Sequence, residues 1–167
     1  MSCDGSRYSE SALQFAIEMT KACGSVALPS ASVKSTTKHD VRIILLNVLP
    51  ELYIPEMLED HIFHSLITSE RISTREYIKE FCQQMKKEHV RMMDPVKENI
   101  ESNGVPSKYE VLLGYPADTI IEYAKTNRID LIVMGTAGLR GISRIRSLGG
   151  VARSVAERSP CPVTLVH

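Results

Sequence analysis

The chain has 167 residues, of which 43% are hydrophobic and 24% charged, enough to bury a core within one domain. Its 20 basic and 20 acidic residues balance, so no net field draws it to nucleic acid or to an anionic membrane. The four cysteines lack both the paired spacing of a zinc site and the density of a disulfide scaffold. No apolar run approaches the roughly 20 residues of a membrane span, and the charged first residues are unlike a signal peptide. We therefore expect a single cytoplasmic domain over residues 1–167 that binds neither nucleic acid nor membrane.

The first half of the chain predicts two helices and a strand. Apolar residues at helical spacing predict a helix from Ser9 to Lys21 that Gly24 can close. The polar stretch that follows, residues 25–38, predicts a flexible loop. The apolar run from Val41 to Leu49 is typical of a strand buried on both faces of a parallel sheet. A long helical pattern then runs from about Ile67 to Asn103, with Pro95 expected to kink or divide it.

The second half alternates between short apolar runs and helical patterns. The expected order is strand, helix, strand, helix, strand, over Tyr109–Leu113, Pro116–Lys125, Ile129–Met134, Gly150–Arg158 and Pro162–Val166. Such alternation indicates parallel β-α-β units with helices on both faces of the sheet. In open sheets of this kind, ligands bind outside the carboxyl ends of the strands.

A glycine-rich turn follows the strand that ends at Met134. Gly135 and Gly138 stand at this turn, and Gly149-Gly150 opens the next helix. Glycines here allow close approach of a ligand, and the helix amides supply donors and a partial positive charge, which suits phosphate. Residues 131–153 contain no acid but four arginines, Arg140, Arg144, Arg146 and Arg153. The alternative is an ordinary surface turn with solvated arginines, and spacing alone leaves both interpretations open.

Other residues with reactive or ligating side chains give weaker signals. His61 and His64 could lie on one helix face as metal ligands, but no third ligand is evident, and an ordinary surface pair is favoured. Cys161 between two prolines indicates a structural thiol rather than a nucleophile. No set of nucleophile, base and orienting group is present, so we expect no catalytic residue.

The motifs together resemble the universal stress protein family, in its nucleotide-binding branch. The resemblance covers nearly the whole chain in order, apart from residues 25–38. It is carried by Gly135-x2-Gly138 with Gly149-Gly150-Val151, by Asp4-Gly5-Ser6, by Leu45-Leu46-Asn47-Val48, by Gly114-Tyr115-Pro116-Ala117, by Asp130 to Gly135, and by Ser159-Pro160-Cys161-Pro162-Val163.

The resemblance implies an α/β fold with an open parallel five-stranded sheet of order 3-2-1-4-5 and helices on both faces. It implies ATP or AMP as ligand, with Mg²⁺ as a further candidate at the phosphates, and a homodimer through Val163–Val166. Asp4 would lie near the nucleotide, Val48 would offer its backbone to the adenine, and Met134 would flank the base or ribose. The phosphates would be surrounded by Gly135, Gly138, Gly149, Gly150 and Val151, beside Arg140 of the arginine-rich turn.

Three features depart from the family pattern. Ten residues separate Gly138 from Gly149, one more than is usual in the family. Gly150 replaces a Ser or Thr, and the lost hydroxyl should cost about 1 kcal/mol of phosphate binding. Only Met1, Ser2 and Cys3 precede Asp4, where the family has its central strand, so we expect either that the chain starts downstream of its natural start or that the first strand is truncated to a stub.

Two functions remain open from the sequence. The first is a small cytosolic stress-response protein that binds an adenine nucleotide and acts as a sensor or regulator. The second is a dimeric stress-related interaction module that has lost nucleotide binding. An enzyme is less favoured, with slow ATP hydrolysis at most, because the glycine-rich turn offers no carboxylate.

Overall fold

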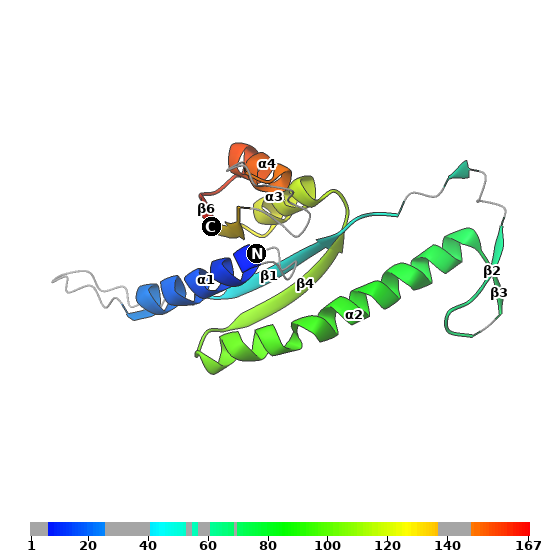
Figure 1. The fold of residues 1–167 in the computed structure, drawn as a ribbon, viewed down its shortest axis with the longest axis horizontal. Coiled ribbons are helices and arrows are strands. Elements are labelled where there is room, and N and C mark those ends of the chain that lie inside the picture. Colours follow the sequence, from blue (N-terminus) through cyan, green and yellow to red (C-terminus); the bar gives the residue numbers. More distant parts are fainter. Residues whose placement is uncertain (1–6, 26–40, 53–54, 57–60, 69, 137–147) are drawn as a thin grey trace.

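The computed structural model describes residues 7–25, 41–52, 55–56, 61–68, 70–136 and 148–167 (Figure 1). The predicted loop and the predicted stub of a first strand lie outside these residues, except for Ser25. The elements are α1 (Arg7–Ser25), β1 (Ile43–Leu49), β2 (Ile62–His64), β3 (Arg71–Ser73), α2 (Thr74–Ser102), β4 (Ser107–Leu113), α3 (Pro116–Thr126), β5 (Ile132–Gly135), α4 (Gly150–Arg158) and β6 (Val163–Val166).

The parallel α/β architecture is confirmed. β1 pairs in parallel with β4, from Ile43 opposite Ser107 to Leu49 opposite Leu113. β5 pairs in parallel with β6, from Ile132 opposite Val163 onward. These two pairs correspond to positions 3-2 and 4-5 of the expected order. No pairing between described strands joins β1 to β5, so the full order of five strands stays a prediction.

Helices cover both faces of the strands because side chains alternate along each strand. One core cluster joins α1 and β1 to the C-terminal end of α2, through Leu13, Ile17, Ile43, Leu45 and Ile100. A second cluster lies on the opposite face of β1. It joins Leu46 to α3, β5 and α4, through Ile120, Ala124, Ile132, Met134, Ala152 and Val155.

Helix α1 is longer than the sequence predicts. It begins at Arg7 and ends at Ser25, so Gly24 lies within the helix rather than closing it. The buried residues Ala12, Leu13 and Ile17 form the apolar stripe that the spacing predicts.

The region before α2 differs from the prediction. Ile67, Thr68 and the residues from 70 to 73 are not helical, and β3 occupies Arg71–Ser73 and pairs antiparallel with β2. α2 instead begins at a capping box in which Ser73 Oγ accepts from the Glu76 amide and the Glu76 carboxylate accepts from the Ser73 amide. His64 therefore lies in a strand, and the two histidines do not share a helix face.

Pro95 does not divide α2, which runs without interruption from Thr74 to Ser102. Pro95 removes one intrahelical hydrogen bond, but Met93 and Val96 beside it pack against the buried Ile100 cluster and hold this part of the helix in place.

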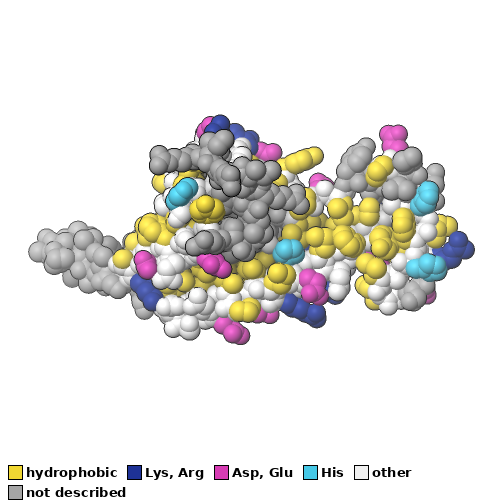
Figure 2. Space-filling view, in the orientation of Figure 1, with side chains coloured by type: hydrophobic (Ala, Val, Ile, Leu, Met, Phe, Trp, Pro, Cys, Tyr) yellow, Lys and Arg dark blue, Asp and Glu magenta, His cyan; other side chains and the backbone are white. Residues whose placement is uncertain are grey.

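The N-terminal part of α2 and the β2–β3 hairpin project away from the rest of the molecule (Figure 1). The stacked rings of Phe63 and Tyr77, with centroids 4.7 Å apart, join the hairpin to the helix. The Glu80 carboxylate also accepts a hydrogen bond from Ser65 Oγ at 2.9 Å. Hydrophobic side chains lie on the surface of this projecting end (Figure 2), where Ile62 is 60% and Ile67 67% exposed.

None of the helices that the structure describes is long and apolar enough to cross a membrane.

Candidate functional site

The end of β5 and the start of α4 are held together by backbone hydrogen bonds. The amide of Thr136 donates to Val166 O at 2.9 Å, which extends the β5–β6 pairing by one residue. The amide of Gly149 donates to Thr136 O at 2.8 Å. The glycine pair Gly149-Gly150 therefore lies directly beside the end of β5, the strand that contains Gly135.

The first turn of α4 is open and carries no acidic residue. Gly149 is the N-cap and contributes no side chain, and the helix begins as the amide of Arg153 donates to Gly149 O at 2.9 Å. The amides of the first turn before Arg153 have no partner within the helix, which gives this end a partial positive charge. Gly150 and Val151 are exposed, and a Cβ placed on Gly150 would meet no atom within 4 Å.

Gly135 lies against the first turn of α1. A Cβ placed on it would stand 2.8 Å from Tyr8 Cβ and 2.9 Å from the Tyr8 carbonyl carbon. The backbone of β5 can approach α1 this closely only because position 135 has no side chain. The strand end, α1 and α4 therefore meet at one edge of the molecule.

Three side chains that the sequence did not single out gather at this edge. The Tyr8 and His167 rings are tilted by 47°, with centroids 5.4 Å apart. Thr136 Oγ1 and His167 Nδ1 share a hydrogen bond of 2.7 Å. These residues come from the start, the later part and the end of the chain, and no local pattern in the sequence signals their contact.

The end of β1 supplies a second group of residues. Asn47 is buried, and its Nδ2 lies 3.1 Å from His89 Nδ1 on α2. Val48 is half-buried and packs against the core cluster beneath α3. The amide of Gly114 donates to Leu49 O at 2.9 Å, so the end of β4 lies beside the end of β1.

The structure brings together only some of the predicted site residues. Gly135, Gly149, Gly150 and Val151 lie around Thr136 at the junction of β5 and α4. Asp4, Gly138 and Arg140 lie outside the described residues. Met134 is only 4% exposed, with its side chain in the core. The assignment of these residues to a ligand stays a prediction.

No group of three or more His, Cys, Asp or Glu side chains that could hold a metal ion occurs among the described residues. Cys23, Cys82 and Cys161 are free thiols. Cys161 is half-buried and packs against the second core cluster.

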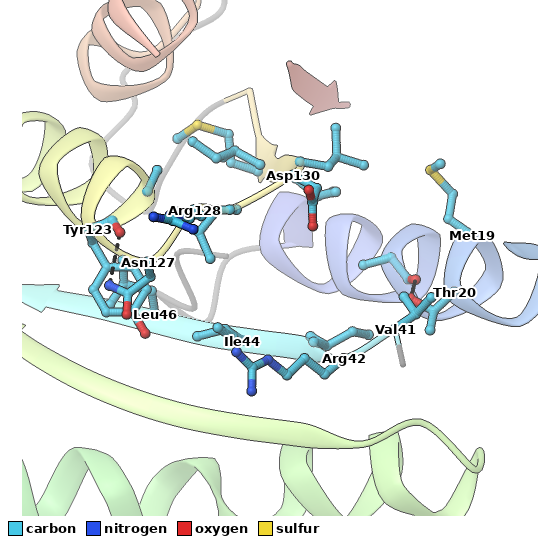
Figure 3. A pocket seen from close by; sticks show the side chains of 18 of the residues that line it. Met19, Thr20, Val41, Arg42, Ile44, Leu46, Tyr123, Asn127, Arg128 and Asp130 are labelled. Atoms are coloured by element: carbon cyan, nitrogen blue, oxygen red, sulfur yellow. Dashed lines mark hydrogen bonds between the residues drawn. The ribbon is translucent and has the colours of Figure 1, made fainter. Parts of the chain in front are cut away.

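A cavity of about 860 Å³ lies away from this glycine edge, between β1 and β5 (Figure 3). Its lining comes from α1, β1, α3, β5 and the residues just before β5. Of the predicted site residues that the structure describes, only Met134 contributes to this lining. The cavity and the glycine edge are therefore different features.

Parallel strand pairs covered by helices on both faces, with glycines where β5 meets α4, define a protein of the parallel α/β class. The model of the universal stress protein family matches residues 3–167. The chain belongs to this family.

Curated relatives agree with this membership. The chain is 43% identical to universal stress protein MJ0531 of Methanocaldococcus jannaschii over 82 residues, which are 49% of this chain and 48% of that protein. It thus spans about half the length of that relative. It is 28% identical to MJ0577 of the same organism over 143 residues, which are 84% of this chain and 85% of that protein.

Solved structures show the same fold. The universal stress protein UspA from Lactobacillus plantarum has a TM-score of 0.69 at 20% identity, covering 98% of this chain and 92% of that one. The structure of MJ0577 has a TM-score of 0.63 at 24% identity, covering 96% and 90%. A universal stress protein in complex with cAMP has a TM-score of 0.55 at 19% identity, covering 100% and 93%.

Proposed function

We propose that this chain binds an adenine nucleotide, ATP or AMP, at the carboxyl ends of β1 and β5, with the phosphates at the first turn of α4. The observation that carries the proposal is the open, acid-free start of α4, fixed beside the end of β5 by the bond from Gly149 to Thr136. Membership of the universal stress protein family, and the cAMP complex of one structural neighbour, support the same class of ligand.

The phosphate contacts would come mainly from backbone amides. A helix N-terminus combines unpartnered N–H groups with a positive dipole end, and both favour a phosphate. Gly150 has no hydroxyl, so its amide and that of Val151 would be the donors. Gly138, Asp4 and Arg140 would add to the site from segments outside the described residues.

The adenine would lie toward β1, where Val48 offers backbone groups at the strand end. Because the Met134 side chain is buried in the core, we expect only its backbone to approach the base or ribose. No described cluster of carboxylates could hold a metal, so Mg²⁺ would be held chiefly by the phosphates.

We further propose that the protein is a cytosolic regulator that acts as a homodimer through β6. The amide of Ile132 donates to Pro162 O and that of Thr136 to Val166 O. Since parallel strands bond through alternate residues, Val163 and Leu165 direct their backbone groups away from β5. No described strand pairs with that outer edge, which a second copy could cover.

The missing hydroxyl of Gly150 also favours the second candidate, a dimeric interaction module without nucleotide. Titration calorimetry with ATP, AMP and cAMP separates the two. The nucleotide proposal predicts binding below millimolar concentration, and no heat with the parent protein at millimolar ATP would leave only the interaction module.

A matched pair of variants then tests the place of the phosphates. Gly150→Asp puts a carboxylate at the start of α4, where it should repel a phosphate, while Gly150→Asn has nearly the same size without the charge. A side chain fits there without contact, so both variants should fold. We expect Asp to weaken ATP binding at least tenfold more than Asn does, and Gly150→Ser to strengthen it by about fivefold, which equals one hydrogen bond of about 1 kcal/mol. Equal affinities for Asp and Asn would place the phosphates elsewhere.

A further inference from the structure

We propose that the projecting arm, which consists of the β2–β3 hairpin and the first half of α2 (residues 61–68 and 70–89), binds the arm of a second copy of this chain. The two arms would lie side by side about a two-fold axis and cover each other's apolar faces. This interface is separate from the nucleotide site and from the outer edge of β6, and it depends on neither.

The first argument is that the apolar stripe of α2 is longer than the core beneath it. Met93, Val96 and Ile100 pack in the first core cluster on the sheet. Toward the N-terminus the stripe continues at helical spacing through Met85 and Phe81, in the part of α2 that projects (Figure 1). Neither of these two residues belongs to a described core cluster. The helix therefore carries an apolar face that the core of its own chain does not cover.

The second argument is that the hairpin joins this face to a larger apolar patch. Phe63 stacks on Tyr77, and Phe81 follows one turn later on the same face of α2. The amide of Leu66 donates to the Glu80 carboxylate at 2.9 Å, which holds the turn of the hairpin beside the same part of the helix.

The arm patch, as we call this surface, is well exposed. Hydrophobic side chains gather on this end of the molecule (Figure 2). The patch consists of four residues, Ile62, Leu66, Ile67 and Phe81, which are 60%, 51%, 67% and 38% exposed. Contiguous apolar surface of this kind on a water-soluble domain marks an interaction site. Aromatic residues such as Phe81 are enriched at the centres of protein interfaces.

The charges of the arm favour a copy of itself as the partner. Apart from histidines, the charged side chains of residues 61–89 are five basic and four acidic ones. A surface so close to neutral attracts neither a strongly acidic nor a strongly basic partner. It also does not repel a second arm of the same composition, so apolar contact between two copies meets no net electrostatic cost.

The shape of the arm fits the same partner. Because the arm projects from the rest of the molecule, two arms can lie alongside each other with the two bodies at opposite ends (Figure 1). The helical part from Thr74 to His89 is about 24 Å long, and with the hairpin beside it one face covers roughly 400 Å². Two such faces form an interface of the weak, reversible class, below about 1200 Å² in total. We therefore expect a dissociation constant of about 1–100 µM.

The test is sedimentation velocity on the full chain between about 1 and 200 µM, a range that brackets the expected dissociation constant. We expect the mass of the parent protein to double across this range. The doubling takes a dimer to a tetramer if β6 also forms its interface, and a monomer to a dimer if it does not. Ile67→Lys and Phe81→Lys should each weaken the doubling at least tenfold, because the new charge would lose its hydration between the arms.

Val90→Lys is the matched control. Val90 is 44% exposed and stands nine residues after Phe81, which places it on the opposite face of α2. It adds the same charge to the same helix and should leave the doubling unchanged. Circular dichroism checks that each variant is folded. If Phe81→Lys disturbs the helix, Ile67→Lys decides, because Ile67 lies in the turn between β2 and β3.

Hydrogen exchange locates the contact on the arm. The hairpin is short, so its amides should exchange rapidly in the separate chain. We expect their exchange to be at least tenfold slower at the highest protein concentration than at the lowest, with the amides of α3 as the internal reference.

Several results would overturn the proposal. A parent protein whose mass stays constant over the whole range would leave the arm patch to an unlike protein. A doubling that Ile67→Lys does not weaken would place the interface elsewhere, and one that Val90→Lys weakens equally would reflect net charge rather than the patch. Hairpin exchange that is the same at every concentration would show that a second copy does not cover the arm.

Discussion

Replacement of Gly135 by alanine should destabilise the protein, because the added methyl group would clash with Tyr8 on α1. A Cβ at position 135 would stand 2.8 Å from Tyr8 Cβ, 2.9 Å from the Tyr8 carbonyl carbon and 3.0 Å from its oxygen. Two of these atoms belong to the α1 backbone, so a rotation of the Tyr8 side chain cannot relieve the contact. Either α1 or the end of β5 must move.

The magnitude follows from this geometry. A methyl group forced into a closely packed contact typically costs about 1–3 kcal/mol, and the value here should lie in the upper part because backbone atoms must shift. Gly150→Ala is the matched control, since its Cβ would meet nothing within 4 Å. The control should be neutral or stabilising by about 0.4–1 kcal/mol, because alanine restricts the unfolded chain.

Urea denaturation followed by circular dichroism measures both free energies of unfolding. We expect Gly135→Ala to fall below Gly150→Ala by about 2–4 kcal/mol, which for a chain of this length is a difference of about 4–16 °C in thermal midpoint. If Gly135→Ala is as stable as the parent protein, the close approach of β5 to α1 is wrong, and with it the position of α1 at the glycine edge.

Two further predictions concern single side chains. Thr136→Val keeps the shape of the side chain but removes the 2.7 Å hydrogen bond to His167. The loss should lower the free energy of unfolding by about 1 kcal/mol in the same denaturation assay. An unchanged free energy would show that the bond contributes nothing to stability. Burial, and then the negative charge of the hydrogen-bonded Glu110, raise the pKa of Tyr123 to about 12. The neutral phenol is thus favoured in the folded state, so its contribution to stability is complete below pH 10 and is lost as the pH rises through about 12. Absorbance titration at alkaline pH should show a late tyrosine step that Tyr123→Phe removes, and a step that persists in that variant would contradict the assignment.

The sequence predicts most elements in the second half of the chain because each has a strong local signal. The helix from Gly150 to Arg158 is confirmed at both ends, since glycines open it and the apolar positions Ala152 and Val155 keep helical spacing. β4 and β6 match the predicted strands to within two residues. β4 pairs in parallel with β1 and β6 with β5, because a helix, α2 or α4, connects the two strands of each pair.

The β2–β3 hairpin could not be predicted from periodicity. Each of its strands has three residues, too few for an alternation to show, and Ile67 and Ile72 extend the helical pattern of α2 toward the N-terminus. One local signal does mark the true start of the helix. Ser73 followed three residues later by Glu76 is a capping-box sequence.

The candidate site likewise has one part that the sequence predicts and one part that it does not. The glycines at the junction of β5 and α4 were predicted because turn chemistry is local. The contacts among Tyr8, Thr136 and His167 depend on the tertiary fold, which brings distant segments together at one edge. Met134 is a residue that the sequence assigned to the site because it precedes Gly135. Its position in the sequence does not indicate that its side chain belongs to the core.

The length of helix α2 has a mechanical consequence for the end of β1. Its 29 residues correspond to a stiff rod of about 44 Å, of which the C-terminal part is anchored on the sheet by Ile100 while the other end carries the hairpin. Near the middle of this rod, His89 contacts Asn47, the residue before Val48 on β1. A force or a partner that displaces the hairpin would therefore tilt α2 as a rigid body. The contact between His89 and Asn47 would transmit this movement to the end of β1, next to where the adenine is expected.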